Sequence, residues 1–211
     1  MGAKKASERS RENLHNKLEQ QGLKLPLYPT PTIIDRARKV MGSIDFDPTS
    51  DPVQQVLVEA TSIPSIEHNP LQITWKGNCF VAPKGAVRLT RMWFDKTISE
   101  YRNNKIKSFV FFTSASELLR SDPSIWDYPL CIPFKRVKQL RATSKGFEAV
   151  SPSTWNVIVY GPPLDQGISD IDKTSLFYDT FRDIGRVIFN EYAGDSWQRD
   201  LEYYEEHKDQ F

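Results

Sequence analysis

The sequence predicts an α/β fold in which a sheet of buried strands carries helices on both faces. Short apolar runs at 78–83, 108–113 and 155–160 are typical of strands in the interior of such a sheet. Segments 32–41 and 86–105, whose apolar residues recur at helical spacing, alternate with these runs. The chain has 211 residues, 39% of them hydrophobic, which is enough to bury one sizeable core.

Residues 1–24 are expected to form a mobile, basic and weakly helical arm. They contain six lysines or arginines against three glutamates, and almost no apolar residue precedes Leu23. A charged terminus of this kind is usually solvated, and a basic strap over a phosphate backbone is the functional alternative. Residues 25–31 then enter the fold as an extended segment, because each proline biases the residue before it away from the helical conformation.

An α/β domain is expected over residues 25–164. Its first helix, 32–41, is followed by Gly42, where a C-terminal cap favours glycine. Proline closes the strands expected at 43–48 and 78–83, since proline cannot continue a strand ladder. Three further strands are expected at 108–113, 130–134 and 155–160.

Residues 165–211 are expected to form an amphipathic helix followed by an acidic tail. Apolar side chains between Ile171 and Tyr192 fall on one helical stripe, which packs into a core or docks on a protein partner. Before this segment, the stretch from Arg136 to Pro152 holds several basic residues. We interpret it as a solvated loop, with a local basic patch as the alternative.

Composition excludes several classes of protein. The formal net charge of +1 gives no global field toward nucleic acid or membrane, so any contact with DNA has to come from a local patch. The three histidines are scattered and the two cysteines lie in apolar runs, which predicts no metal site and no disulfide. No apolar run reaches the roughly 20 residues that cross a membrane. We therefore expect a soluble, cytoplasmic protein.

Two acidic side chains, Asp45 and Asp47, come at the carboxyl end of the strand expected at 43–48. In open α/β sheets, ligands bind beyond the carboxyl ends of the strands, near the point where the strand order reverses. A carboxylate there accepts hydrogen bonds from a ribose hydroxyl or holds a ligand ammonium. The alternative is a plain turn and helix cap over residues 47–52, because Asp, Ser, Thr and Pro are ordinary turn residues.

The order of short motifs along the chain resembles the phage-encoded DNA N-6-adenine methyltransferase (Dam-like) family. Each motif is weak alone, and the order and spacing carry the resemblance, which covers roughly residues 28–161. The motifs are Tyr28 to Pro31, Ile44 to Ser50, Asn69 to Leu71, and Trp75 to Pro83.

The resemblance implies a compact Rossmann-like class I methyltransferase sheet, encoded by a phage or mobile element and working in a bacterial host cell. In that family a Thr-Pro entry segment and an Asp-x-Asp-Pro-x-Ser strand end bind S-adenosylmethionine. The corresponding cofactor-binding residues here are Thr30, Pro31, Asp45, Asp47 and Ser50.

The catalytic tetrapeptide of that family is replaced. The family has Asn-Pro-Pro-Tyr where this chain has Ala82, Pro83, Lys84 and Gly85. In the family, the Asn side chain and the first Pro carbonyl accept hydrogen bonds from the target amino group, and the Tyr ring stacks on a flipped base. Ala82 has no side-chain acceptor and Gly85 has no ring, while Lys84 is interpreted as an exposed loop lysine. No intact catalytic residue is left at these positions.

We therefore expect a methyltransferase-like pseudoenzyme that keeps a cofactor pocket, a DNA-binding role or an assembly role. The first alternative is an active or weakly active S-adenosylmethionine-dependent DNA adenine methyltransferase, with its acceptor supplied by Asn78, Ser114 or Glu117. The second alternative is a structural scaffold whose C-terminal helix docks on a protein partner.

Overall fold

The structure is a computed structural model, and it describes residues 26–85, 87–164 and 170–189. The basic arm expected over residues 1–24 and the acidic tail after residue 189 lie outside the described residues. Within them, five α-helices accompany one five-stranded and one three-stranded sheet. The prediction of an α/β fold is confirmed at this level.

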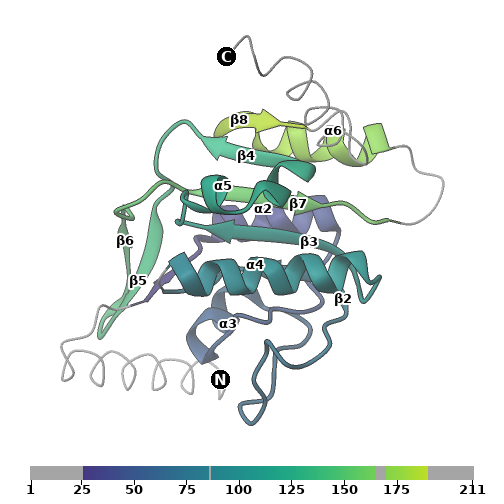
Figure 1. Cartoon of the computed structure of the whole chain (residues 1–211). Coiled ribbons are helices and arrows are strands. Elements are labelled where there is room, and N and C mark those ends of the chain that lie inside the picture. The colour runs from purple at the N-terminus through teal and green to yellow at the C-terminus, as the bar shows by residue number, and fades with distance from the viewer. Residues whose placement is uncertain (1–25, 86, 165–169, 190–211) are drawn as a thin grey trace.

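The larger sheet is mixed and has the strand order β2-β3-β7-β4-β8 (Figure 1). Strands β2 and β3 are parallel, and the other three pairings are antiparallel. The strand expected at 43–48 is reduced to a bridge residue, Phe46, which pairs in parallel with Cys79 of β2 and with Ser62. The strands are β2 (Gly77–Val81), β3 (Ile106–Thr113), β4 (Leu130–Pro133), β7 (Val157–Gly161) and β8 (Gly185–Ile188).

The strand order reverses beside Phe46. The chain leaves Phe46, passes through helix α3 (Pro52–Val58), and returns at Ser62 on the side of Phe46 away from β2. It then crosses back to form β2 on the other side. Phe46 and β2 therefore flank a topological switch point, and Asp47 and Ala82 are the first residues beyond their carboxyl ends.

Helices cover both faces of the larger sheet because its strands alternate their side chains between two apolar clusters. Phe80 of β2 points toward the cluster that includes helices α2 (Pro31–Met41) and α6 (Asp170–Phe181). Its neighbour Cys79 points toward the cluster that includes helix α4 (Val87–Arg102). Figure 1 shows α4 in front of the sheet and α2 behind it.

The C-terminal helix is shorter than expected. The apolar stripe predicted a helix as far as Tyr192, but α6 ends at Phe181 and β8 begins at Gly185. A side chain at position 185 would have its Cβ only 2.5 Å from the carbonyl oxygen of Ile132, so the glycine permits close pairing with β4. Pairing along the open edge of β4 therefore overrides the helical pattern of these apolar residues.

The stretch from Arg136 to Pro152 is also not a loop. It contains the antiparallel strands β5 (Gln139–Thr143) and β6 (Gly146–Val150). Strand β1 (Leu27–Tyr28) pairs with β5 and completes the three-stranded sheet. The pairing buries Tyr28 and Ala142 together, which gives this hairpin its own small apolar cluster.

Replacing Phe177 by alanine tests whether α6 is part of the core. Phe177 is fully buried, and its ring stacks on that of Tyr160 with centroids 5.2 Å apart. We expect Phe177→Ala to lower the free energy of unfolding by about 3–5 kcal/mol, the usual cost of truncating a buried Phe. Urea denaturation followed by circular dichroism measures the change.

Leu176→Ala is the matched control on the same helix. The Leu176 side chain is 39% exposed, so its truncation should change the free energy of unfolding by less than about 1 kcal/mol. Equal effects of the two substitutions would show that α6 does not pack on the sheet as described.

Candidate functional site

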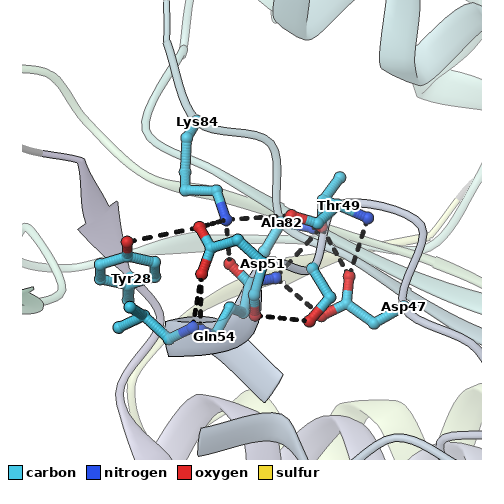
Figure 2. A network of polar contacts seen from close by, with 9 residues as sticks. Tyr28, Asp47, Thr49, Asp51, Gln54, Ala82 and Lys84 are labelled. Atoms are coloured by element: carbon cyan, nitrogen blue, oxygen red, sulfur yellow. Dashed lines mark hydrogen bonds and ion pairs between the residues drawn. The ribbon is translucent and has the colours of Figure 1, made fainter. Parts of the chain in front are cut away.

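A buried polar network lies at the switch point, beyond the carboxyl ends of Phe46 and β2. We call it the switch-point network, and it joins four parts of the chain: the turn after Phe46, the first turn of α3, the loop after β2, and Tyr28 of β1 (Figure 2). Its members are Tyr28, Asp47, Thr49, Asp51, Gln54, Ala82 and Lys84.

Asp47 is the fully buried centre of this network. Its Oδ1 accepts hydrogen bonds from the Thr49 backbone N–H at 2.9 Å and from the Thr49 hydroxyl at 2.7 Å. Its Oδ2 accepts from Gln54 Nε2 at 2.7 Å. All three partners are donors, so the site is arranged to hold a carboxylate rather than a neutral acid. These bonds offset part of the cost of removing the charge from water.

Helix α3 supplies the second layer of the network. Asp51 caps its N-terminus, accepting hydrogen bonds from the backbone N–H groups of Val53 and Gln54. Pro52 takes the first helical position, where a missing N–H costs nothing. The sequence Asp-x-x-Gln at 51–54 has the spacing of a capping box, which could have indicated this helix. Here, however, the Gln54 amide turns to Asp47 instead of back to the cap.

Lys84 closes the network from the loop after β2. Its ammonium donates to the Thr49 carbonyl at 2.9 Å, to Asp51 Oδ2 at 2.8 Å and to Gln54 Oε1 at 2.9 Å. All three donors of the ammonium are therefore used. The ammonium also lies 5.0 Å from the centroid of the Tyr28 ring, a cation–π distance. The expectation of an exposed loop lysine is wrong, because the side chain is only 18% exposed.

The surroundings of the network shift the pKa values of two of its side chains, Asp47 and Tyr28. Burial raises the pKa of Asp47, whereas the hydrogen bonds from Gln54 and Thr49 and the nearby Lys84 ammonium lower it. Burial, together with the Asp51 carboxylate, raises the pKa of Tyr28. The Tyr28 hydroxyl therefore keeps its proton at neutral pH and donates it to Asp51 Oδ2 at 3.3 Å.

Asp45 lies apart from this network. Its Oδ1 accepts from the Ser43 hydroxyl at 2.8 Å, and its Oδ2 accepts from the Asn78 backbone N–H at 2.9 Å. The carboxylate thus contacts the beginning of β2, and it lies so close to Gly77 that a Cβ there would be 2.5 Å from Oδ2. Asp45 and Asp47 are close together in the predicted motif, but Asp45 binds the beginning of β2 whereas Asp47 binds Thr49 and Gln54.

The other three predicted cofactor residues are more open. Thr30 precedes α2 as its N-cap without a side-chain hydrogen bond, and Pro31 is the exposed first residue of that helix. Ser50 is half-buried and donates only a long hydrogen bond, 3.4 Å, to the Asp51 carbonyl. In this arrangement Asp47 is fully buried and its three hydrogen bonds are all made within the protein, so its carboxylate does not face a ligand.

The four residues at the position of the predicted catalytic tetrapeptide, Ala82 to Gly85, are part of the fold around the switch point. Ala82 is buried, and its N–H donates to the Thr49 hydroxyl at 2.9 Å. Gly85 has φ = 118°, a conformation that side chains rarely adopt, so a Tyr at this position would be strained. Pro83 is half-buried between them.

The alternative acceptors named from the sequence have other partners. The Asn78 side chain donates to the Met41 carbonyl and to Ser43, and its oxygen accepts from the Ser108 hydroxyl at 2.8 Å. The Ser114 hydroxyl donates to Gln139 Oε1 at 2.8 Å and accepts from the Asn156 amide. Glu117 is exposed after β3 and makes no side-chain bond to the network.

Other features of the described residues place limits on the site. They contain no cluster of three or more His, Cys, Asp or Glu side chains that could hold a metal ion. Among the same residues, no helix has the length and apolar character needed to cross a membrane. A surface hollow of about 330 Å³ lies at the amino ends of β2 and β3, away from the switch-point network, and is lined in part by Lys105 and Lys107.

Searches of protein-family models, curated proteins and solved structures found no match to this chain. The resemblance to the adenine methyltransferase family is therefore still a prediction from the motifs.

Removing the Lys84 charge should destabilise the protein in a pH-dependent way. A carboxyl whose pKa is raised in the folded state stabilises the fold below its ordinary pKa of 3.8 and loses that contribution as the pH rises. Lys84→Met removes an ammonium that lowers the pKa of Asp47. The pKa of Asp47 should therefore rise further in the variant, and more of the unfolding free energy should be lost as the pH increases. We expect a decrease in unfolding free energy of about 2–3 kcal/mol near pH 8, shrinking toward pH 4.

Chemical denaturation at several pH values measures this difference. Lys76→Met, which removes an exposed lysine before β2, is the control and should have a small effect at every pH. A decrease for Lys84→Met that is independent of pH would show that Lys84 does not act on a buried carboxylate.

Proposed function

We propose that this chain is a catalytically inactive, methyltransferase-like protein of phage or mobile-element type, which acts by binding and not by methyl transfer. The observation that carries the proposal is the position of Lys84. Its ammonium occupies the acceptors at the switch point, where a ligand of this fold class would be held. The motifs still support descent from a DNA adenine methyltransferase.

The sheet topology supports the descent. A reversal of strand order beside Phe46, parallel neighbours on both sides of that residue, and helices on both faces are features of doubly wound nucleotide-binding folds. The turn from Asp47 to Pro52 is at the reversal, where the resemblance puts the cofactor. The Rossmann-like assignment is part of the proposal.

The loss of catalysis follows from the chemistry of the amino group. An amino nitrogen conjugated into a purine is a poor nucleophile until hydrogen bonds draw out its lone pair. Ala82 supplies no acceptor, and the acceptor oxygens of Asn78 and Ser114 already have protein donors. By analogy with deletions in oxyanion holes, loss of one such group costs a factor of about 10²–10³ in rate.

Cofactor binding is disfavoured by charge. S-adenosylmethionine carries an ammonium, a sulfonium and a carboxylate, so it brings a net positive charge to its site. Lys84 already neutralises Asp51 at 2.8 Å and interacts with the buried Asp47. A second cation at the same place would be repelled by Lys84 and would lack a free carboxylate.

We expect the wild-type chain to bind no S-adenosylmethionine in isothermal titration calorimetry and to transfer no radiolabelled methyl group to adenine-containing DNA. The physical reason is the combination of occupied acceptors and a resident cation. An active DNA adenine methyltransferase in the same buffer provides the positive control for both assays.

Methyl transfer that is detected and then lost in Asp47→Ala would overturn the proposal, because it would show a working site that depends on Asp47. Binding of S-adenosylmethionine without methyl transfer would agree with the loss of catalysis, but it would contradict the claim that Lys84 excludes the cofactor. Neither assay depends on any particular partner of the protein.

A further inference from the structure

Exposed aromatic rings and unpaired cations occur together between the end of β4 and the start of β7. We call this region the aromatic–basic surface, and it lies at the carboxyl edge of the larger sheet, beside the β5-β6 hairpin (Figure 1). It consists of Phe134, Lys135, Arg136, Lys138 and Trp155.

The two rings of this surface are exposed, and hydrogen bonds hold the Trp155 indole and the backbone of Phe134. Phe134 is 62% exposed and Trp155 is 43% exposed, large values for such apolar side chains. The Phe134 backbone N–H donates to the Ile184 carbonyl at 2.9 Å. The Trp155 indole donates to the Pro133 carbonyl at 2.8 Å, which ties that ring to the residue before Phe134. These bonds order the segments that carry the rings before any ligand binds, so binding loses less conformational entropy there.

The stretch of chain that carries Phe134 is strongly basic. Residues 128–147 contain no acidic side chain, although the whole chain has a net charge of only +1. Within the described part of the chain, the cations of the surface form no ion pair with a carboxylate. The five basic residues of this stretch are Lys135, Arg136, Lys138, Arg141 and Lys145.

A buried amide fixes the backbone beneath the surface. The fully buried Asn156 accepts from the Val137 N–H at 2.6 Å, and its Nδ2 donates to the Ser114 hydroxyl at 3.1 Å. Arg136 donates to the carbonyls of Pro152 and Ser153, so it also holds the segment that leads to Trp155. The two loops that carry the rings are therefore connected by hydrogen bonds.

We propose that the aromatic–basic surface binds single-stranded DNA. Exposed aromatic rings among cations suit a strand whose bases are free to stack and whose phosphates lie alongside. A duplex hides its base faces and would leave both rings without a partner. The lysine and arginine heads are donors only, so they cannot accept the proton of a 2′-hydroxyl, and the surface has no side-chain group that selects RNA over DNA through that proton. Binding at this surface involves neither S-adenosylmethionine nor the residues of the switch-point network.

Fluorescence anisotropy with a labelled oligothymidine of about 15 nucleotides and the full-length chain tests the proposal. We expect saturable binding that weakens as salt rises. Neutralisation of about three phosphates corresponds to a slope of log K against log salt near −2 for a single strand. A self-complementary duplex of the same length should bind at least about 10-fold more weakly than the single strand.

Substitutions distinguish base stacking on the rings from nonspecific attraction of anions by the lysines. Phe134→Ala should weaken binding of oligothymidine by about 10-fold or more, and the double substitution Lys135→Gln with Lys138→Gln should weaken binding and flatten the salt slope. Trp126→Ala removes another exposed ring, 40% exposed, and should have no effect. Lys105→Gln with Lys107→Gln makes the same charge change at the opposite edge of the sheet and should also leave binding unchanged.

Four results would overturn the assignment: no binding, equal affinity for the duplex, tighter binding of oligouridine, or full competition by polyglutamate at the same charge concentration. Each is independent of the cofactor and methyl-transfer assays. A chain that binds oligothymidine and methylates DNA would refute the proposed loss of catalysis while keeping this site.

Discussion

A fully buried carboxylate determines the arrangement of the switch point. Asp47 has no contact with water, so its charge persists only if donors surround it and a cation is near. Thr49 and Gln54 supply the donors, and Lys84 supplies the cation. Because these residues come from a turn, a helix and a loop after a strand, satisfying one carboxylate fixes the relative positions of all three segments.

The contacts that stabilise the Asp47 carboxylate also limit what the site can do chemically. An α/β strand end binds ligands with groups that are left over once the fold is satisfied. Here the ammonium of Lys84 uses Asp51 and the Gln54 oxygen, and the Thr49 hydroxyl takes the backbone N–H of Ala82. Groups that would otherwise face a ligand therefore hold the protein together. The residues at this strand end therefore serve the stability of the fold.

Sequence reasoning located the elements with strong local patterns and missed those decided by tertiary pairing. The proline-closed apolar run ending at Pro83 and the helix ending at Gly42 were correct because local rules suffice for them. The hairpin at 139–150 was missed because its half-polar strands gain their apolar contacts from Tyr28, Val53 and Leu57, which are far away in sequence. Lys84 was misjudged for the same reason, since a lysine in a loop carries no local sign of its partners.

The switch-point network and the aromatic–basic surface are connected through Tyr28. Its backbone pairs with Leu140 of β5, its ring packs edge-on against Phe147 of the hairpin, and its hydroxyl donates to Asp51. The hairpin that follows the cationic loop is thus anchored to the residues that Lys84 binds. The closed strand end therefore supports the hairpin and the cationic loop that precedes it. Closing the strand end at the switch point and positioning the neighbouring surface are thus two results of one set of contacts.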